Sequence, residues 1–303
     1  MRILVTGAAG FIGSNLTLAL QKRFPASEIL ALDNFLTGAD ENLRGFKGAV
    51  LKGPVEDKGF VKSISGKFDY IFHQAAITDT TFTDNKKMTD VNVGGFKNIL
   101  DIAVHGKTKV IYASSAGVYG AGPAPMKETQ KLSPLNAYAS SKVKMDEISQ
   151  EIAKEKKIKV IGLRYFNVYG PREARKGSSS SMIFQLAKQM KAGNAPRIFR
   201  YGEQKRDHIY VKDVAEANIK AMDASVSCVV NVGTGEATTF NRVIEILNKV
   251  LNTDFKPEYF DNPYDFYQNN TQADTSAAES IIGFKARYSI EKGIEDYIKN
   301  YLP

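Results

Sequence analysis

A tyrosine and a lysine four residues apart carry the clearest chemical signal in the sequence. Tyr138 and Lys142 lie in a segment, 137–154, whose pattern predicts a helix, so the phenol and the ammonium share one helical face. An isolated tyrosine has a pKa of about 10, too high for a base at neutral pH. A cation about 4 Å away contributes roughly 4 kcal/mol at an effective dielectric constant of about 20, and desolvation opposes this pull. The pair predicts a phenol that exchanges a proton with an alcohol.

Two serines precede this pair in the sequence. Ser114 and Ser115 end the predicted strand 109–115, about 25 residues before the tyrosine. Doubly wound folds bind ligands at the carboxyl ends of their strands, so a serine hydroxyl emerges where a ligand would lie. We expect Ser115 to hydrogen-bond the reacting hydroxyl. By itself such a serine would be a strand-end cap, and by itself a Tyr/Lys spacing of four is common on solvated helix faces.

A glycine-rich turn precedes the first predicted helix. Gly7, Gly10 and Gly13 follow the apolar segment 2–6 directly, and the helix opens near Phe11 and Ile12. The first glycine allows a tight turn, the second lets a pyrophosphate approach the helix N-terminus, and the third lets helix and strand pack closely. The turn therefore predicts a dinucleotide cofactor.

Asp33 bears on the choice between NAD and NADP. It ends the second predicted strand, 20 residues after Gly13, where a carboxylate accepts hydrogen bonds from an adenosine ribose and repels a 2′-phosphate. This favours NAD. Arg44, Lys47 or Lys52 folding back onto a 2′-phosphate would favour NADP instead, so both cofactors stay open.

The elements that must position these residues alternate along the first half of the chain. The apolar runs 2–6, 28–33, 70–74, 109–115 and 160–166 are typical of buried parallel strands, and amphipathic segments such as 14–23, 91–103 and 137–154 separate them. This alternation predicts an α/β fold, a Rossmann-type doubly wound parallel sheet with a smaller C-terminal substrate-binding lobe.

The alternation stops after residue 170. We expect residues 1–170 to form the dinucleotide-binding domain and residues 171–303 the substrate-binding lobe, with the chain returning to the first domain around 207–236. A helix near 182–192 and a strand near 229–235 are predicted in this half. Asp213 and Glu216 have the spacing of a capping box that opens another helix.

Composition narrows the class of protein. Of the 303 residues, 43% are hydrophobic and 24% charged, which is typical of a folded globular chain. The 41 basic and 33 acidic residues give a net charge of +8 that suits an anionic small ligand, and their even spread disfavours nucleic acid. A single cysteine, Cys228, fits a reducing compartment, so a cytoplasmic protein is expected. No apolar run suggests a membrane span, and no cluster of ligand residues suggests a metal.

Taken together, these residues resemble the extended short-chain dehydrogenases/reductases that act on nucleotide sugars. The resemblance spans nearly the whole chain and includes segments 73–76, 164–172, 206–213 and 231–235 together with Asn92. It implies a tightly bound NAD or NADP, a nucleotide-diphosphate sugar as substrate, and a homo-oligomer. The cofactor contacts it implies are Gly7, Gly10, Phe11, Ile12, Gly13, Asp33, Asn34, Ala75, Asn92, Tyr138, Lys142 and Val168.

One branch of this family is especially similar. Segments 165–173, 176–178, 205–207 and 271–274 resemble the ADP-glycero-manno-heptose 6-epimerases, which supply precursors of lipopolysaccharide. The resemblance implies that hydride leaves C6, that a transient ketone turns in the pocket, and that the same hydride returns to the opposite face. Acid/base groups are then needed on both sides of the reacting carbon. Lys176 matches the second such group, beside Ser115, Tyr138 and Lys142.

The same resemblance implies the substrate contacts, of which Arg206 is suited to grip a diphosphate bidentately. They are Ser114, Asn167, Ser178, Gln185, Arg206 and Tyr267. Three departures from the branch stand out. Gln185 replaces an expected histidine, Pro54 stands near where an acidic residue contacts the adenine, and segment 35–40 lacks the basic residue that accompanies NADP.

Other functions remain open at this point. A UDP-hexose 4-epimerase would share Ser115, Tyr138 and Lys142 without requiring Lys176. A non-catalytic dinucleotide sensor would keep only the glycine turn. A dehydratase is disfavoured, because an acidic pair typical of such enzymes is replaced by Ala116 and Gly117.

Overall fold

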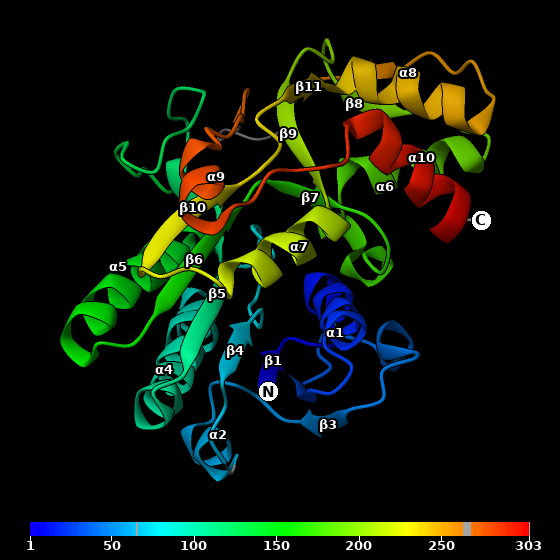
Figure 1. Cartoon of the computed structure of the whole chain (residues 1–303). Helices are drawn as coiled ribbons and strands as arrows, with labels where there is room; N and C mark the ends of the chain where they lie inside the picture. Colours follow the sequence, from blue (N-terminus) through cyan, green and yellow to red (C-terminus); the bar gives the residue numbers. More distant parts are fainter. Residues whose placement is uncertain (65, 263–267, 303) are drawn as a thin grey trace.

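The largest part of the protein is a parallel sheet of seven strands covered by helices on both faces (Figure 1). The structure, a computed structural model, describes residues 1–64, 66–262 and 268–302. The strand order is β10-β6-β5-β4-β1-β2-β3, and each neighbouring pair is parallel. The predicted α/β, Rossmann-type fold is confirmed. The strands are β1 Arg2–Thr6, β2 Glu28–Asp33, β3 Ala49–Lys52, β4 Tyr70–His73, β5 Lys109–Ser115, β6 Val160–Tyr165 and β10 Cys228–Val232.

The central strands form where the sequence is apolar without alternation, because both faces of the sheet are buried. In β1, Ile3, Leu4 and Val5 are fully buried, and every residue of β6 is buried. The edge strand β3 was missing from the sequence prediction. Most of its residues are exposed, so it lacks the apolar run that marks a buried strand.

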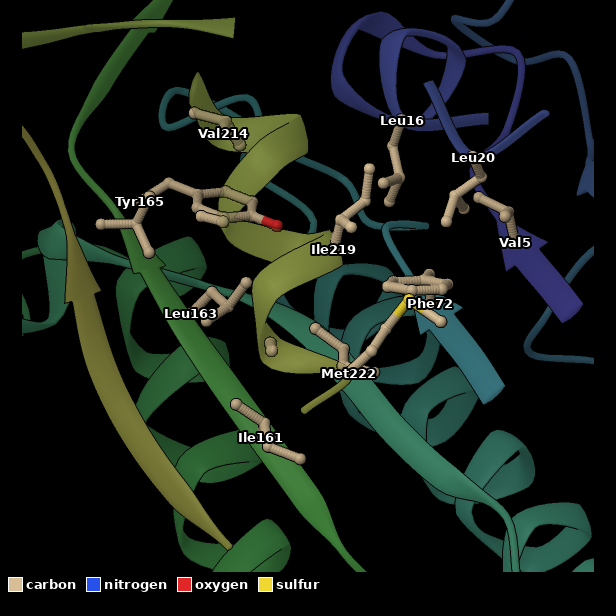
Figure 2. Close-up of a cluster of buried hydrophobic side chains, with 14 of the residues drawn as sticks. Val5, Leu16, Leu20, Phe72, Ile161, Leu163, Tyr165, Val214, Ile219 and Met222 are labelled. Atoms are coloured by element: carbon tan, nitrogen blue, oxygen red, sulfur yellow. The ribbon is translucent and has the colours of Figure 1, made fainter. Parts of the chain in front are cut away.

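Helices cover the two faces of the sheet. On one face, α1 (Phe11–Arg23) and α7 (Val211–Ala221) pack against each other and against the sheet, and α9 (Ser276–Ile282) lies beside β10. Figure 2 shows this core, in which Leu16, Ile219 and Met222 meet Phe72 of the sheet. The other face carries α2 (Lys58–Ser63), α4 (Gly95–Gly106) and α5 (Ala137–Lys156).

A smaller group of elements lies at one end of the sheet. It contains the sheet β11-β9-β7 and the strand pair β12-β8. Helices α6, α8 and α10 share one hydrophobic cluster with β7 and β9. The bounds are β7 Asn167–Tyr169, β8 Arg197–Phe199, β9 Lys205–Tyr210, β11 Ala237–Thr239, β12 Glu258–Phe260, α6 Met182–Lys191, α8 Phe240–Leu251 and α10 Ile290–Tyr301. The division into domains at residue 170 stays a prediction.

Short helical segments complete the chain. They are η1 Asp40–Leu43, α3 Asn85–Thr89, η2 Asp90–Gly94, η3 Ala116–Tyr119 and η4 Ala174–Ser179. None of the helices in the described part of the chain has the length and apolarity needed to cross a membrane. The same residues contain no group of three His, Cys, Asp or Glu side chains placed to hold a metal ion.

The predicted capping box at Asp213 is wrong. Helix α7 begins at Val211, and its N-cap residue Tyr210 makes no side-chain cap. The buried Asp213 carboxylate instead accepts hydrogen bonds from the backbone N–H groups of Arg287 and Tyr288, at 3.1 and 3.0 Å. Asp213 thus ties the segment before α10 to α7, a long-range contact that the local spacing conceals.

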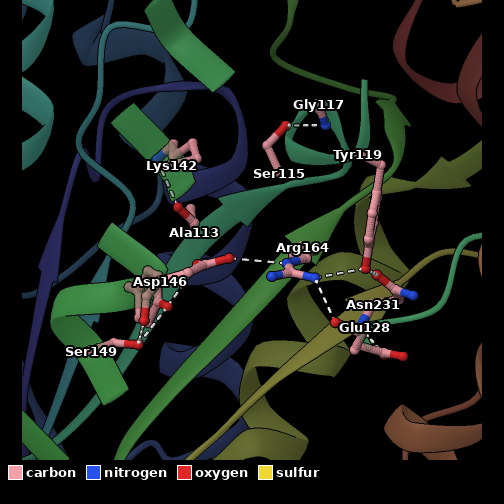
Figure 3. Close-up of polar contacts among 11 residues, drawn as sticks. Ala113, Ser115, Gly117, Tyr119, Glu128, Lys142, Asp146, Ser149, Arg164 and Asn231 are labelled. Carbon is pink, nitrogen blue, oxygen red and sulfur yellow. Dashed lines mark hydrogen bonds and ion pairs between the residues drawn. The ribbon is translucent and has the colours of Figure 1, made fainter. Parts of the chain in front are cut away.

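A buried ion pair fixes helix α5 to the sheet (Figure 3). Arg164 Nε of β6 lies 3.0 Å from Asp146 Oδ2 of α5, and both side chains are almost fully buried. Tyr112 of β5 donates its hydroxyl to the other carboxylate oxygen at 2.8 Å, and Arg164 Nη1 donates to the Tyr119 hydroxyl at 2.9 Å. These bonds hold the helix that carries Tyr138 and Lys142 against two strands.

We predict that Asp146→Ala destabilises the fold by about 3–5 kcal/mol, because it leaves the Arg164 guanidinium buried and unpaired. The free energy of unfolding is measured by urea titration followed by circular dichroism. The matched control is Lys144→Ala, which breaks the exposed pair with Glu147 on the same helix and should barely move the midpoint. Equal midpoints for the two variants would contradict the structural role given to Asp146.

Candidate active site

A cavity of about 1100 Å³ opens at the carboxyl ends of the parallel strands. Its walls come from the turn after β1, the end of β2, the segment after β4, the end of β5 and the segment after β6. Helices α5 and α6, strands β7, β8 and β9 and the segment η4 contribute further parts of the wall. Typical small-molecule sites measure about 300–1,000 Å³, so this one is large enough for a dinucleotide and a second ligand.

The glycine turn forms one wall of the cavity. Gly7 has φ of +65°, and a Cβ on Gly13 would lie 1.9 Å from the Gly7 carbonyl oxygen. Gly10 is the N-cap of α1 and offers no side chain to its N–H groups. Phe11 and Ile12 line the cavity beside the three glycines. The turn therefore presents the N-terminus of α1 at short range, which suits an anionic pyrophosphate.

The end of β2 provides a second fixed group. The Asp33 carboxylate accepts hydrogen bonds from Ala9 N at 2.8 Å and Phe35 N at 2.7 Å and lines the cavity with Asn34. Arg44, Lys47 and Lys52, the residues considered for a 2′-phosphate, are not among the lining residues.

Glu56 is a lining residue that the sequence did not single out. Its Oε2 is buried and has no hydrogen-bond partner in the described residues, so it offers an acceptor to a ligand's N–H or O–H group. The acidic residue expected after the third strand is thus present, two positions after Pro54. The resemblance placed this residue around 53–55, so Glu56 lies one position beyond the expected range. With Ala75 and Val168 also lining the cavity, the residues present fit NAD.

Asn92 and His73 lie behind the cavity rather than in it. We expected Asn92 to contact the cofactor, but it is fully buried and absent from the lining. Its amide accepts from Ile77 N at 2.8 Å and donates to Ile77 O and Ser141 Oγ, both at 3.0 Å. Asn92 therefore positions the cavity-lining segment at Ile77 relative to α5. The His73 ring contacts Thr6 Oγ1 through Nδ1 at 2.8 Å and stacks on Phe96.

Ser115, Tyr138 and Lys142 meet at the end of β5, as the spacing predicts. Asn136 caps the first turn of α5 by accepting from Ala139 N at 2.8 Å, which fixes the start of the helix beside that strand. Ser115 is hydrogen-bonded to Tyr138, and the Lys142 ammonium lies 5.7 Å from the centre of the Tyr138 ring. Figure 3 shows Lys142 directed at Ala113 O, to which its Nζ donates at 2.7 Å.

The sequence predicted that Lys142 lowers the pKa of Tyr138. This prediction is wrong for the protein without a bound ligand. Burial raises the pKa of this phenol, and the hydrogen bond from Ser115 offsets only part of the rise. The Lys142 ammonium donates to the Ala113 carbonyl at 2.7 Å and lies 5.7 Å from the centre of the Tyr138 ring. Burial also lowers the pKa of Lys142 to about 8, against the pull of Asp146. The phenol is therefore protonated at neutral pH.

The residues expected at the substrate come from several elements. Lys176 and Ser178 reach the cavity from η4, Gln185 from α6, Asn167 from β7 and Arg206 from β9. Ser114 Oγ is buried in the lining and has no hydrogen-bond partner within the described part of the chain. Tyr267 lies outside the described residues.

Two of these side chains are held in place by the protein. Gln185 Nε2 donates to Ser178 O at 3.0 Å and Ser180 O at 2.8 Å, so its amide group shapes the serine-rich loop. Lys176 Nζ lies 5.7 Å from the centre of the Phe11 ring, next to the glycine turn. Burial lowers the pKa of Lys176 and the nearby Glu173 opposes the shift. A half-buried lysine at the cavity differs from the solvated loop residue that the basic segment 172–176 alone would suggest.

Comparison with known proteins places the chain in a family. The model of the NAD dependent epimerase/dehydratase family matches residues 3–233. The chain belongs to this family. It is therefore an NAD-dependent enzyme, and the NAD predicted from Asp33 is confirmed at the level of the family.

Solved structures resemble the chain over nearly its whole length. ADP-L-glycero-D-manno-heptose-6-epimerase of Helicobacter pylori is 40% identical, with a TM-score of 0.92 and coverage of 98% of this chain and 94% of that one. UDP-glucose 4-epimerase of Thermotoga maritima, solved with UDP-glucose, is 29% identical, with a TM-score of 0.93 and coverage of 99% and 98%. UDP-N-acetylglucosamine 4-epimerase of Methanobrevibacter ruminantium is also 29% identical, with a TM-score of 0.92 and coverage of 98% and 97%.

We predict that Gly13→Ala weakens NAD binding at least about tenfold, because the added methyl group overlaps the Gly7 carbonyl and must displace the turn. The dissociation constant is measured by isothermal titration calorimetry, with circular dichroism as a check on folding. Gly94→Ala is the control, since a Cβ there meets no atom within 4 Å and should leave NAD binding unchanged. Wild-type affinity in a folded Gly13→Ala protein would show that the turn does not hold the dinucleotide.

Proposed function

We propose that the protein is a nucleotide-sugar epimerase that inverts C6 of ADP-glycero-manno-heptose, with Tyr138 and Lys176 as its two acid/base groups. The observation that carries the proposal is that Lys176, from outside the parallel sheet, lines the same cavity as Ser115 and Tyr138. The 40% identity to the Helicobacter pylori heptose epimerase supports the same substrate. The proposal also includes that the enzyme is a homo-oligomer, that it works in the cytoplasm, and that it supplies precursors of lipopolysaccharide.

The reaction divides between the cofactor and the side chains. The glycine turn and Asp33 would hold NAD, which would supply reversible hydride transfer at the sugar carbon. Tyr138 accepts the alcohol proton from one orientation of the sugar, while Ser115 holds the same oxygen. The phenol is protonated in the free protein, so it must release its own proton before it can accept one from the alcohol. The Lys142 ammonium then stabilises the tyrosinate electrostatically.

The second orientation needs a second proton carrier, because one phenol cannot face the reacting oxygen on both sides of the carbon. Lys176 serves here since it comes from η4 beside Phe11, whereas Tyr138 comes from α5. Its pKa is lowered by burial, which brings a lysine closer to exchanging protons at neutral pH. Arg206, Asn167 and Ser178 supply polar contacts for the rest of the substrate.

We predict that Lys176→Met lowers the turnover of ADP-glycero-manno-heptose about 100-fold or more, the range typical of a lost general acid or base. Conversion at C6 is measured by NMR of the isolated nucleotide sugar, and NAD binding is measured in parallel and should not change. Lys188→Met, on the exposed face of α6, removes an equal charge outside the cavity and should be fully active. Full activity of Lys176→Met would remove the lysine from the mechanism.

A UDP-hexose 4-epimerase is the second candidate. It is favoured by the similarity to the Thermotoga maritima enzyme and by Gln185, which replaces the histidine typical of the heptose branch. The same assay with UDP-glucose decides between the two. If Lys176→Met converts UDP-glucose to UDP-galactose as fast as the wild type does, and ADP-heptose does not react, the protein is the hexose enzyme.

A further inference from the structure

His208 is a buried histidine in the cavity wall whose ring nitrogens have no hydrogen-bond partner among residues 1–64, 66–262 and 268–302. It lies on β9, is 4% exposed, and lines the cavity two positions after Arg206. Both Nδ1 and Nε2 are buried, and neither is hydrogen-bonded to any residue that the structure describes. Buried polar groups in folded proteins are nearly always hydrogen-bonded, so two free ring nitrogens in a cavity wall point to a ligand.

The aromatic neighbours of His208 are not hydrogen-bond partners for it. The Tyr169 ring stands edge-on at 6.4 Å between ring centroids, and the Phe240 ring does so at 6.1 Å. The Tyr169 hydroxyl contacts Ile290 O instead. Burial, assisted by the positive charge of Arg206, lowers the pKa of His208 to about 3. The ring is therefore neutral at physiological pH, with one N–H donor and one acceptor nitrogen.

The strand geometry places His208 with two polar residues already expected at the substrate. Residues two apart on a strand point to the same face of the sheet, so Arg206 and His208 both face the cavity. Asn167 of β7 is the register partner of His208 in the parallel pair and also lines the cavity. A cation, a neutral imidazole and an amide thus share the cavity-facing side of one small sheet.

We propose that His208 binds the substrate by donating a hydrogen bond to an oxygen of its sugar-diphosphate portion, next to the group held by Arg206. This inference rests on the proposed function only in taking the substrate to be a nucleotide sugar. A neutral donor suits this place, because Arg206 already supplies the charge that a diphosphate requires. The acceptor is either a phosphate oxygen or a sugar hydroxyl, and either one would accept the same N–H hydrogen bond from the imidazole.

The test compares His208→Phe, which keeps an aromatic ring, with His208→Gln, which keeps a donor. Dissociation constants of NAD-loaded protein for ADP and for ADP-glucose are measured by calorimetry. We expect His208→Phe to weaken ADP-glucose binding about tenfold or more and His208→Gln to restore most of the loss. NAD affinity should be unchanged in both. His105→Phe, a histidine absent from the cavity lining, is the control and should bind as the wild type does.

The two probes separate the two acceptors. A loss seen equally with ADP assigns the bond to a phosphate oxygen, and a loss confined to ADP-glucose assigns it to a sugar hydroxyl. Wild-type affinity of His208→Phe for both probes would overturn the proposal. If His208→Phe misfolds and loses NAD binding, His208→Met is a second variant that lacks the ring nitrogens. Because the readout is binding, failure of the C6 epimerisation assay would leave this test unaffected.

Discussion

Parallel strand order is the constraint on which the site depends. Every strand of the seven-stranded sheet runs in the same direction, so the residues that follow β1, β2, β4, β5 and β6 meet at one edge. The glycine turn, Asp33, Ser115 and the start of α5 reach the cavity for this single reason. The Arg164–Asp146 pair then fixes α5 against β6, which keeps Tyr138 and Lys142 at that edge.

Burial sets the chemistry of the ionisable groups in this cavity. It raises the pKa of Tyr138 and lowers those of Lys142, Lys176 and His208. Each shift favours the neutral form of the side chain, as expected where water is excluded. The free protein therefore holds the Tyr138 phenol as a hydrogen-bond donor. Because water screens these four side chains poorly, a charged ligand shifts their pKa values strongly. Proton transfer in such a cavity depends on what is bound there.

The sequence predicted what local pattern determines and missed what long-range packing determines. The buried strands and the turn at Gly7 and Gly13 follow from apolar runs and glycine spacing. Strands 2–6, 28–33 and 109–115 have the predicted bounds, and the strands predicted at 70–74 and 160–166 each end one residue earlier. Strand β3 was missed because an exposed edge strand has no such run. The contact of Lys142 with Ala113 and the role of Asn92 behind the cavity depend on residues from other elements. The unpaired ring of His208 likewise appears only once β7 and β9 are assembled.

The central claim is that Tyr138 is a half-buried, neutral phenol beside the cofactor cavity in the free protein. Its ionisation is followed most directly by a pH titration of protein labelled with ¹³C at the tyrosine ζ carbon, with Tyr138→Phe used to assign the resonance. The raised pKa predicts that the titration midpoint of this carbon lies above pH 10, about where an ordinary tyrosine is half ionised. A transition near pH 7 in the ligand-free protein would contradict the account.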